Sequence, residues 1–146
     1  MAPPFALEAA GGGTIDSEKL SGRKVVLYFY PKADTPGCTR EAIDFTRLKG
    51  AFEAAGAVVI GVSADPVKAL DKFAGKHALG VGLGSAPQPV LDAYGVWGEK
   101  SLYGRRFMGI ERATFLIGTD GRIARIWRKV RVAGHAEAVL EAAKAI

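Results

Sequence analysis

Cysteine and histidine are scarce in this sequence. Its 146 residues include one cysteine, Cys38, and two histidines, His77 and His135. A single cysteine cannot form a disulfide within the chain, which excludes a disulfide-stabilised secreted scaffold and the Cys-x-x-Cys chemistry of dithiol oxidoreductases. These three side chains are also too few for a cysteine-based zinc site. They therefore exclude a zinc site of this kind. We expect no metal and no cofactor.

Long hydrophobic runs are missing as well. The longest apolar runs, such as Val25–Tyr30, are far shorter than the roughly 20 residues needed to span a bilayer. The first eight residues lack the basic head and the long apolar stretch of a secretion signal. These features predict a cytoplasmic protein with no membrane partner.

Acidic residues are fewer than basic ones. Lysine and arginine total 20 against 15 aspartates and glutamates, which gives a formal net charge of +5. The excess arginines fall late in the chain, and basic surface of this kind attracts nucleic acid without sequence preference. Because acidic residues are interspersed and no nucleic-acid-binding motif is present, we interpret it as a solvated basic surface with no specific nucleic-acid partner.

The composition that remains is globular, with 49% hydrophobic and 24% charged residues in a chain whose length suits one domain, residues 1–146. Val25–Tyr30 and Val58–Val62 are rich in β-branched and aromatic residues, as strands buried on both faces are. Between them a helical spacing of apolar residues ends near Gly56, and it runs through Ala42, Phe45, Leu48 and Phe52. Strand, helix and strand in this order predict a parallel βαβ unit.

Further elements are predicted on both sides of this unit. Gly11–Gly13 indicates an N-terminal turn, and Asp65 with Pro66 is typical of a helix N-cap and first turn. A loop is expected over residues 80–89. A short helix, a hairpin with an Asp-Gly turn and a last helix are expected at Val90–Tyr94, Thr114–Ile117 with Ile123–Trp127, and His135–Ile146. The order predicts an α/β fold with a mixed β-sheet flanked by helices.

Cys38 has a position that suits chemistry. It follows the first strong strand near the start of a helix, and ligands in open α/β sheets bind at the carboxyl ends of strands. Unpaired N–H groups at a helix N-terminus favour an anion such as a thiolate. A lone cysteine is more often a buried, inert hydrophobic residue. The surrounding residues, Asp34–Arg40, are polar and rich in turn-forming types, which favours a reactive thiol over an inert core cysteine.

Two separated blocks of sequence resemble one protein family. Val26–Glu41, with Pro31, Thr35 and Cys38 in the spacing Pro-x3-Thr-x2-Cys, resembles the active-site segment of peroxiredoxins. The second block, which contains an arginine at the entry to a strand, falls on Tyr94–Lys100 and Gly109–Ile117. Within the family the chain resembles the peroxiredoxin Q subgroup, also called bacterioferritin comigratory protein. The resemblance implies a thioredoxin-like fold, which agrees with the predicted element order.

The resemblance also implies a role for each matching residue. Cys38, as a thiolate, attacks a hydroperoxide and becomes a sulfenic acid, while Arg112 stabilises the thiolate and the charge that develops in the transition state. Thr35 is expected to orient the peroxide through its hydroxyl, and Pro31 to cover the thiolate and restrict water. Gly37 is expected to let the backbone approach the peroxide and to offer its N–H.

Three other positions are less clear or depart from the family. Glu41 resembles a residue that orients the arginine, but an exposed first-turn acid that suits the helix dipole is an equally good interpretation. Asp34 we interpret as a solvated loop residue. Many members of the subgroup carry a second cysteine where this chain has Ile43. Its absence implies that an external thiol must reduce Cys38: thioredoxin, glutaredoxin, glutathione or Cys38 of another copy, in a monomer or a homodimer.

The predicted function is that of a one-cysteine, thiol-dependent peroxidase that reduces hydrogen peroxide and small organic hydroperoxides in antioxidant defence. The alternative is a peroxide-sensing or chaperone-like binding protein on the same fold. The combination of Thr35, Cys38 and Arg112 favours the enzyme, because a sensor does not need a transition-state arginine. A Cys–His hydrolase that pairs Cys38 with His77 is disfavoured, because it leaves Thr35 and Arg112 unexplained.

Overall fold

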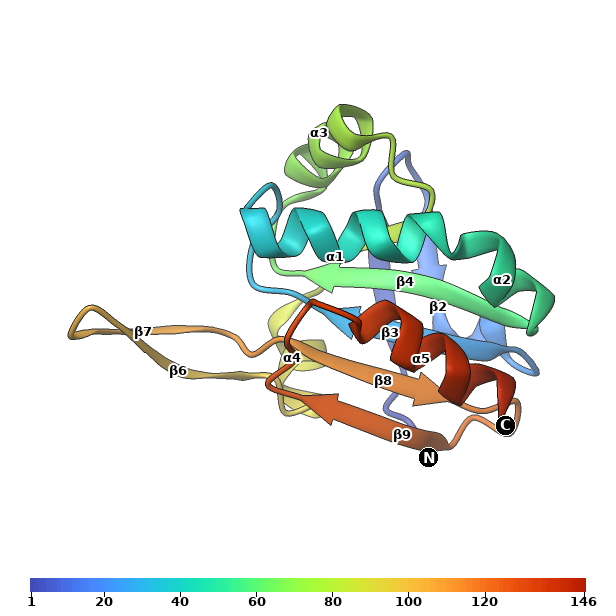
Figure 1. The fold of residues 1–146 in the computed structure, drawn as a ribbon. Coiled ribbons are helices and arrows are strands. Elements are labelled where there is room, and N and C mark those ends of the chain that lie inside the picture. The colour runs from blue at the N-terminus through green and yellow to red at the C-terminus, as the bar shows by residue number, and fades with distance from the viewer.

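The protein is built around a seven-stranded mixed sheet with strand order β2-β1-β5-β4-β3-β8-β9, and a separate two-stranded hairpin, β6-β7, extends from it (Figure 1). The computed structural model describes residues 1–146. The strands are β1 (Ala6–Ala9), β2 (Thr14–Asp16), β3 (Lys24–Phe29), β4 (Ala57–Ser63), β5 (Gly82–Ser85), β6 (Trp97–Leu102), β7 (Arg105–Ile110), β8 (Ala113–Ile117) and β9 (Ile123–Arg128). The helices are α1 (Pro36–Arg47), α2 (Lys49–Ala54), α3 (Val67–His77), α4 (Gln88–Ala93), α5 (His135–Lys144) and a 3-10 turn, Ser17–Leu20.

The predicted βαβ unit is confirmed. Strands β3 and β4 are parallel neighbours, joined by α1 and α2, and all but the first residue of β3 is buried. The burial of β3 follows from its composition. Valine and aromatic side chains suit a central strand, because both of its faces are covered and neither is exposed to solvent. The predicted hairpin of β8 and β9 is also present, and β9 forms one edge of the sheet.

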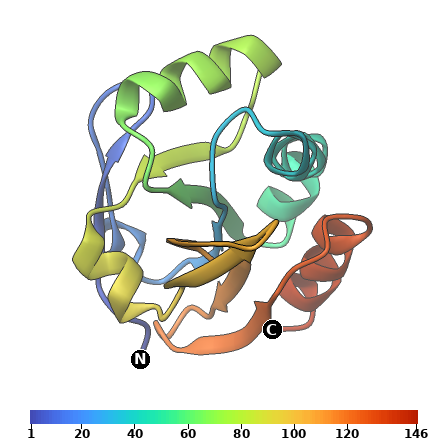
Figure 2. The same cartoon turned by 90° about the vertical axis from the view of Figure 1, so that its left-hand side faces the viewer.

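Each face of the sheet carries its own hydrophobic core, because successive side chains of a strand point to opposite faces. Val26 and Tyr28 belong to the core beneath α1, α3 and α5, whereas Leu27 and Phe29 belong to the core beneath α4 and the N-terminal segment. Figure 2 shows α3, α1 and α5 on one side of the sheet and α4 on the other. This arrangement confirms the mixed sheet flanked by helices.

Several boundaries differ from the expectation. The first helix begins at Pro36, before the predicted helical spacing that starts at Ala42, because proline fits the first turn, where no N–H bond is needed. It is interrupted at Leu48 and resumes as α2. Asp65 is not a helix cap: α3 is capped by Pro66, and the Asp65 carboxylate instead accepts hydrogen bonds from the Ala33 N–H and the Ser63 hydroxyl, both at 2.8 Å.

The predicted loop over residues 80–89 contains a strand, β5, and the start of α4. One of the glycines that suggested a loop, Gly84, serves close packing instead. A Cβ atom at Gly84 would lie 2.6 Å from the Leu7 side chain on the neighbouring strand β1. At the other end of β1, Gly11–Gly13 forms the turn that joins it to β2, with φ positive at all three residues.

The sheet register brings two distant segments together at one edge. Strand β8 runs antiparallel to β3, and Phe29, the last residue of β3, pairs with Ala113, the first residue of β8. The loop that leaves β3 towards α1 therefore lies beside the residue that enters β8, Arg112. No helix of this fold has the length and apolar character that crossing a bilayer demands.

A close contact beneath α1 predicts the effect of one added methyl group. A Cβ atom at Gly61 would lie 2.5 Å from the Tyr28 hydroxyl, and the Tyr28 ring is fixed by stacking on Phe45 with ring centroids 4.6 Å apart. We expect Gly61→Ala to lower the free energy of unfolding by about 1–3 kcal/mol, measured by urea denaturation. Gly50→Ala is the control, since nothing lies within 4 Å of its Cβ position; it should leave stability unchanged or raise it by about 0.5–1 kcal/mol. Equal stability of the two variants would contradict the contact.

Candidate active site

The candidate site begins at the first turn of α1. Thr35 is the N-cap residue with extended backbone, Pro36 is the first helical residue, and Cys38 is the third. The amide N–H groups of Gly37 and Cys38 donate to no other backbone or side-chain group. Two free N–H donors at a helix N-terminus form a site that favours negative charge.

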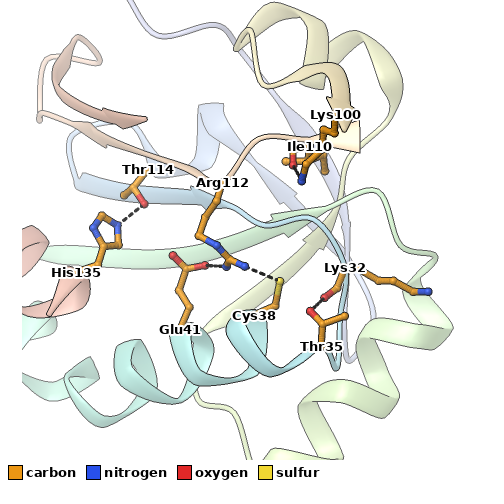
Figure 3. Close-up of polar contacts among 9 residues, drawn as sticks. All are labelled: Lys32, Thr35, Cys38, Glu41, Lys100, Ile110, Arg112, Thr114 and His135. Atoms are coloured by element: carbon orange, nitrogen blue, oxygen red, sulfur yellow. Dashed lines mark hydrogen bonds and ion pairs between the residues drawn. The ribbon is translucent and has the colours of Figure 1, made fainter. Parts of the chain in front are cut away.

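Arg112 links Cys38 to Glu41 (Figure 3). Its Nη2 donates to the Cys38 Sγ at 3.3 Å, and its Nη1 donates to the Glu41 Oε1 at 2.7 Å. Cys38 and Glu41 lie on the same face of α1, one turn apart, so one planar guanidinium reaches both. The arginine comes from the entry to β8, 74 residues from the cysteine. The predicted proximity of Cys38 and Arg112 is therefore confirmed.

The burial of Cys38 differs from the expectation. The polar loop around Cys38 favoured a reactive thiol over a buried, inert one, but the side chain is only 1% exposed and packs in the core beneath α1. Its sulfur nonetheless differs from that of an inert core cysteine, because a guanidinium donates to it. The sulfur is thus a buried acceptor of a charge-assisted hydrogen bond.

The interpretation of Glu41 as an exposed acid is wrong. The residue is 1% exposed, since it lies on the face of α1 that packs against the sheet, and it pairs with Arg112. Burial raises the pKa of Glu41 to about 7, although the Arg112 charge acts in the opposite direction. Its second oxygen, Oε2, has no hydrogen-bond partner, which is consistent with an incompletely stabilised carboxylate.

Arg112 keeps its charge in this half-buried position. Burial by itself disfavours a charged guanidinium, but the neighbouring Glu41 and Cys38 outweigh burial, so the pKa of Arg112 is raised. The phenols of Tyr28 and Tyr30 lie near the same group of charges and have no hydrogen-bond partner. Burial above all raises the pKa of both phenols, so they stay neutral beneath the site.

The remaining predicted residues surround the thiol. The Thr35 hydroxyl donates to the Lys32 carbonyl oxygen at 2.8 Å (Figure 3), so it does not bond to Cys38. A Cβ atom at Gly37 would lie 3.2 Å from the Arg112 Nη2, which explains why the smallest residue fits there. Pro31 is half-buried at the end of β3 and makes no hydrogen bond.

Asp34 is an exposed loop residue, as expected, but its carboxylate also has two partners on α3. Its carboxylate accepts hydrogen bonds from the Lys76 Nζ and pairs with the His77 Nε2, each at 2.9 Å. The hydrogen bond with His77, and then that with Lys76, lowers the pKa of Asp34. These contacts attach the active-site loop to the end of α3. His77 thus contacts Asp34 and not Cys38, and the hydrolase pairing has no structural support.

His135 was not singled out for function from the sequence. It starts α5, and its Nε2 lies 2.8 Å from the Thr114 Oγ1, two residues beyond Arg112. Burial, reinforced by the charge of Arg112, lowers the pKa of His135 to about 4, so the ring is neutral at pH 7. A histidine directly after a glycine at a helix start is too common a pattern to have marked this residue. No three metal-ligating side chains come together anywhere in the chain.

The fold is that of a thioredoxin-like protein whose single cysteine accepts a hydrogen bond from an arginine. Known proteins share both the sequence and the fold. The sequence profile of the AhpC/TSA family matches residues 1–126. The chain is 45% identical over 140 residues to Peroxiredoxin Bcp of Xanthomonas campestris, covering 95% of this chain and 88% of that protein. It is 42% identical over 144 residues to Peroxiredoxin Bcp of Bacillus subtilis, covering 98% and 92%.

A solved structure of the bacterioferritin comigratory protein of Xanthomonas campestris, described for its alkyl peroxide reduction activity, superposes with a TM-score of 0.90 at 44% identity, covering 97% of this chain and 90% of that one. The chain therefore belongs to the AhpC/TSA family, among the Bcp (PrxQ) peroxiredoxins. It is a thiol-dependent peroxidase, an enzyme that reduces a peroxide with electrons from thiols.

The raised pKa of Glu41 predicts how stability depends on pH. A carboxyl whose folded-state pKa, about 7, exceeds its ordinary value of 4.5 contributes stability that is fully present below pH 4.5 and is lost as the pH rises through 7. Denaturation of the reduced protein should show wild type losing roughly 3 kcal/mol at most relative to Glu41→Gln between pH 5 and pH 8. Glu53→Gln, which removes an exposed carboxylate from α2, should show a much smaller change. A difference between wild type and Glu41→Gln that is constant with pH would contradict the assignment.

Proposed function

We propose that Cys38 is the peroxide-reacting thiol of this peroxidase and that its substrates are hydrogen peroxide and small organic hydroperoxides. The observation that carries the proposal is the hydrogen bond from Arg112 to the Cys38 sulfur, at 3.3 Å in a buried setting. A fixed cation beside a thiol stabilises the thiolate, which is the nucleophilic form. The alkyl peroxide reduction activity of the Xanthomonas campestris relative supports organic hydroperoxides as substrates.

The first half-reaction is a two-electron oxidation of sulfur. The Cys38 thiolate attacks the terminal oxygen of the hydroperoxide, an S–O bond forms, the O–O bond breaks, and the electron pair leaves on the second oxygen. The products are a sulfenic acid and an alkoxide or hydroxide, which takes a proton from water. Negative charge moves from sulfur to the departing oxygen, so Arg112 and the free N–H groups of Gly37 and Cys38 stabilise it along the whole path.

Thr35 and Pro31 complete the substrate site in this proposal. Because the Thr35 hydroxyl already donates to the Lys32 carbonyl, its oxygen is left to accept the hydrogen of the peroxide. That orients the terminal oxygen towards the sulfur. Pro31 lacks an N–H and presents an apolar ring at the end of β3, which keeps water from solvating the thiolate. Glu41 positions Arg112 through the ion pair at 2.7 Å.

The second half-reaction uses an external thiol, supplied by thioredoxin, glutaredoxin or glutathione. One thiol attacks the sulfenic sulfur, forms a mixed disulfide and releases water; a second thiol then frees Cys38 as the thiol and leaves with the first as a disulfide. The chain offers no thiol of its own for this step, since Cys38 is its only cysteine and Ile43 stands at the position of the second one. We propose that the single domain of residues 1–146 performs this cycle in antioxidant defence, with no cofactor.

Rapid-mixing kinetics tests the assignment of Cys38 and Arg112. Wild type should consume hydrogen peroxide and tert-butyl hydroperoxide when a thiol is added, and Cys38→Ser should not. Arg112→Lys keeps a positive charge but cannot contact both Cys38 and Glu41, so oxidation should slow on the order of 100-fold at pH 7. Arg128→Lys, which changes an exposed arginine on β9, should oxidise at the wild-type rate.

Several outcomes of that experiment would overturn the proposal. An unchanged rate in Arg112→Lys would remove the arginine from the mechanism. Slow, stoichiometric oxidation of wild type without turnover would favour the peroxide-sensing alternative.

Intact-mass measurement tests the absence of an internal resolving thiol. After one equivalent of peroxide, the protein should gain the mass of one oxygen atom and remain a monomer, because the sulfenic acid at Cys38 has no second cysteine to attack it. Addition of dithiothreitol should restore the original mass. Rapid formation of a covalent dimer would contradict this expectation, because Cys38 of a second copy would then be the resolving thiol.

A further inference from the structure

The β6–β7 hairpin stands apart from the sheet. It projects from the end of the molecule at which β3 terminates and α1 begins (Figures 1 and 2), and it forms a separate two-stranded sheet. Its base is anchored, since Ile110 is buried and Trp97 packs against the core beneath α4. The chain passes directly from its last residue, Ile110, through Glu111 to Arg112. The hairpin is therefore attached rigidly at the edge of the active site.

The outer part of the hairpin is unusually apolar for exposed surface. Four of the eight exposed large hydrophobic residues of the protein lie on it: Leu102, Tyr103, Phe107 and Met108. They lie beside two exposed arginines, Arg105 and Arg106. Tyrosine, phenylalanine, methionine and arginine are the residue types enriched in the centres of protein–protein interfaces.

The strand register assigns these residues to two faces. Leu102 pairs with Arg105 and Lys100 with Phe107, so these four residues share one face of the hairpin, here called the basic–apolar face. No acidic residue lies on that face, and neither Lys100 nor Arg105 forms an ion pair. On the opposite face the Arg106 charge is met by Glu99, at 3.4 Å. The Lys100 ammonium is half-buried and donates to the Ile110 carbonyl oxygen at 2.9 Å, whereas Arg105 is exposed. The basic–apolar face thus combines exposed apolar area with two positive charges that no acidic side chain neutralises.

The tip of the hairpin carries a residue that its turn does not favour. Tyr103 and Gly104 form a two-residue turn with φ of +51° and +77°. Asparagine followed by glycine is the common choice for such a turn, because a tyrosine there is sterically strained. The Tyr103 side chain is 97% exposed and so gains no contact within the fold. A strained aromatic residue held in solvent is typical of a binding contact.

Charge decides between the candidate occupants. A second copy that used the same face would bring Lys100 and Arg105 of one molecule against those of the other. An anionic membrane is recognised by clusters of about four to eight basic residues, whereas this face has two. A protein with an acidic surface around an apolar patch complements the face in both properties. The catalytic cycle also requires an outside thiol at this end of the molecule.

We propose that the β6–β7 hairpin is the docking surface for an acidic thiol-bearing protein that reduces oxidised Cys38. The inference rests on the proposed function and specifies its reductant as a protein and not glutathione alone. Cys38 is 1% exposed, so a partner must remain bound while the sulfur becomes reachable. A hairpin that leads directly into Arg112 keeps the partner at that edge without blocking the loop between β3 and α1.

The test separates docking from chemistry. Cys38 is oxidised with one equivalent of peroxide, and its reduction is then followed with an acidic thioredoxin, an acidic glutaredoxin or dithiothreitol. Arg105→Glu and Phe107→Ser should each slow reduction by at least one of the two proteins about tenfold or more, and leave dithiothreitol and the peroxide step unchanged. Added salt should slow protein-mediated reduction of wild type more than that of Arg105→Glu.

Two matched controls lie outside the hairpin, in the turn between β8 and β9 and on the edge strand β9. Arg122→Glu reverses another exposed arginine without an ion pair, and Ile126→Ser removes an apolar side chain that is 42% exposed, against 45% for Phe107. Both variants should behave as wild type with every reductant. Equal slowing in the controls and the hairpin variants would overturn the proposal, because the effect would then not be local.

The other outcomes are also decisive. Unchanged reduction of the hairpin variants by both proteins, or reduction of wild type by dithiothreitol but by neither protein, overturns the docking proposal. Slower reduction of the hairpin variants by dithiothreitol as well overturns it, because the hairpin would then only support the site. Hairpin-dependent binding to phosphatidylserine vesicles, or hairpin-dependent dimerisation, also overturns it, because the occupant of the hairpin would then be a membrane or a second copy. Failure of wild type to react with peroxide is a different result, which overturns the proposed function itself.

Discussion

The guanidinium of Arg112 is the interaction on which the site depends. It is the cation between two buried acceptors, and it joins the entry of β8 to the first turns of α1. Removal of the cation would leave a buried carboxyl and a buried thiol side by side, a costly arrangement for either charge. Since Glu41 carries one unpartnered oxygen and has a pKa raised to about 7, the pair is not fully stabilised even with the arginine present. The position of Arg112 beside the Cys38 sulfur therefore comes with a destabilising buried carboxyl.

Much of the central fold was predictable from the sequence. The strands at Val25–Tyr30 and Val58–Val62 are signalled by continuous β-branched and aromatic residues, and the β8–β9 hairpin by its Asp-Gly turn. Cys38 and Arg112 were matched through the spacing of two sequence blocks. Their contact follows from the pairing of Phe29 with Ala113, which is a property of the sheet and not of either segment.

Other features depend on tertiary contacts that no local pattern encodes. In strand β5, Leu7 packs so closely over Gly84 that a larger residue would not fit, and glycine makes the strand resemble a loop in sequence. Cys38 is buried by helices and strands from other parts of the chain, although its sequence neighbours are polar. Asp34 gains its role only where the end of α3 meets the loop, with Lys76 and His77 supplied from more than 40 residues away. In each case the decisive partner is distant in sequence.

The solitary thiol also has a kinetic consequence. In the proposed cycle, oxidation and reduction take place at the same sulfur, so the peroxide and the reducing thiol react with it in turn and never together. When thiol supply falls behind peroxide arrival, the oxidised form accumulates and turnover no longer responds to additional peroxide. The steady-state fraction of oxidised protein is then set by the rate of oxidation per reduced molecule relative to the rate of reduction per oxidised molecule.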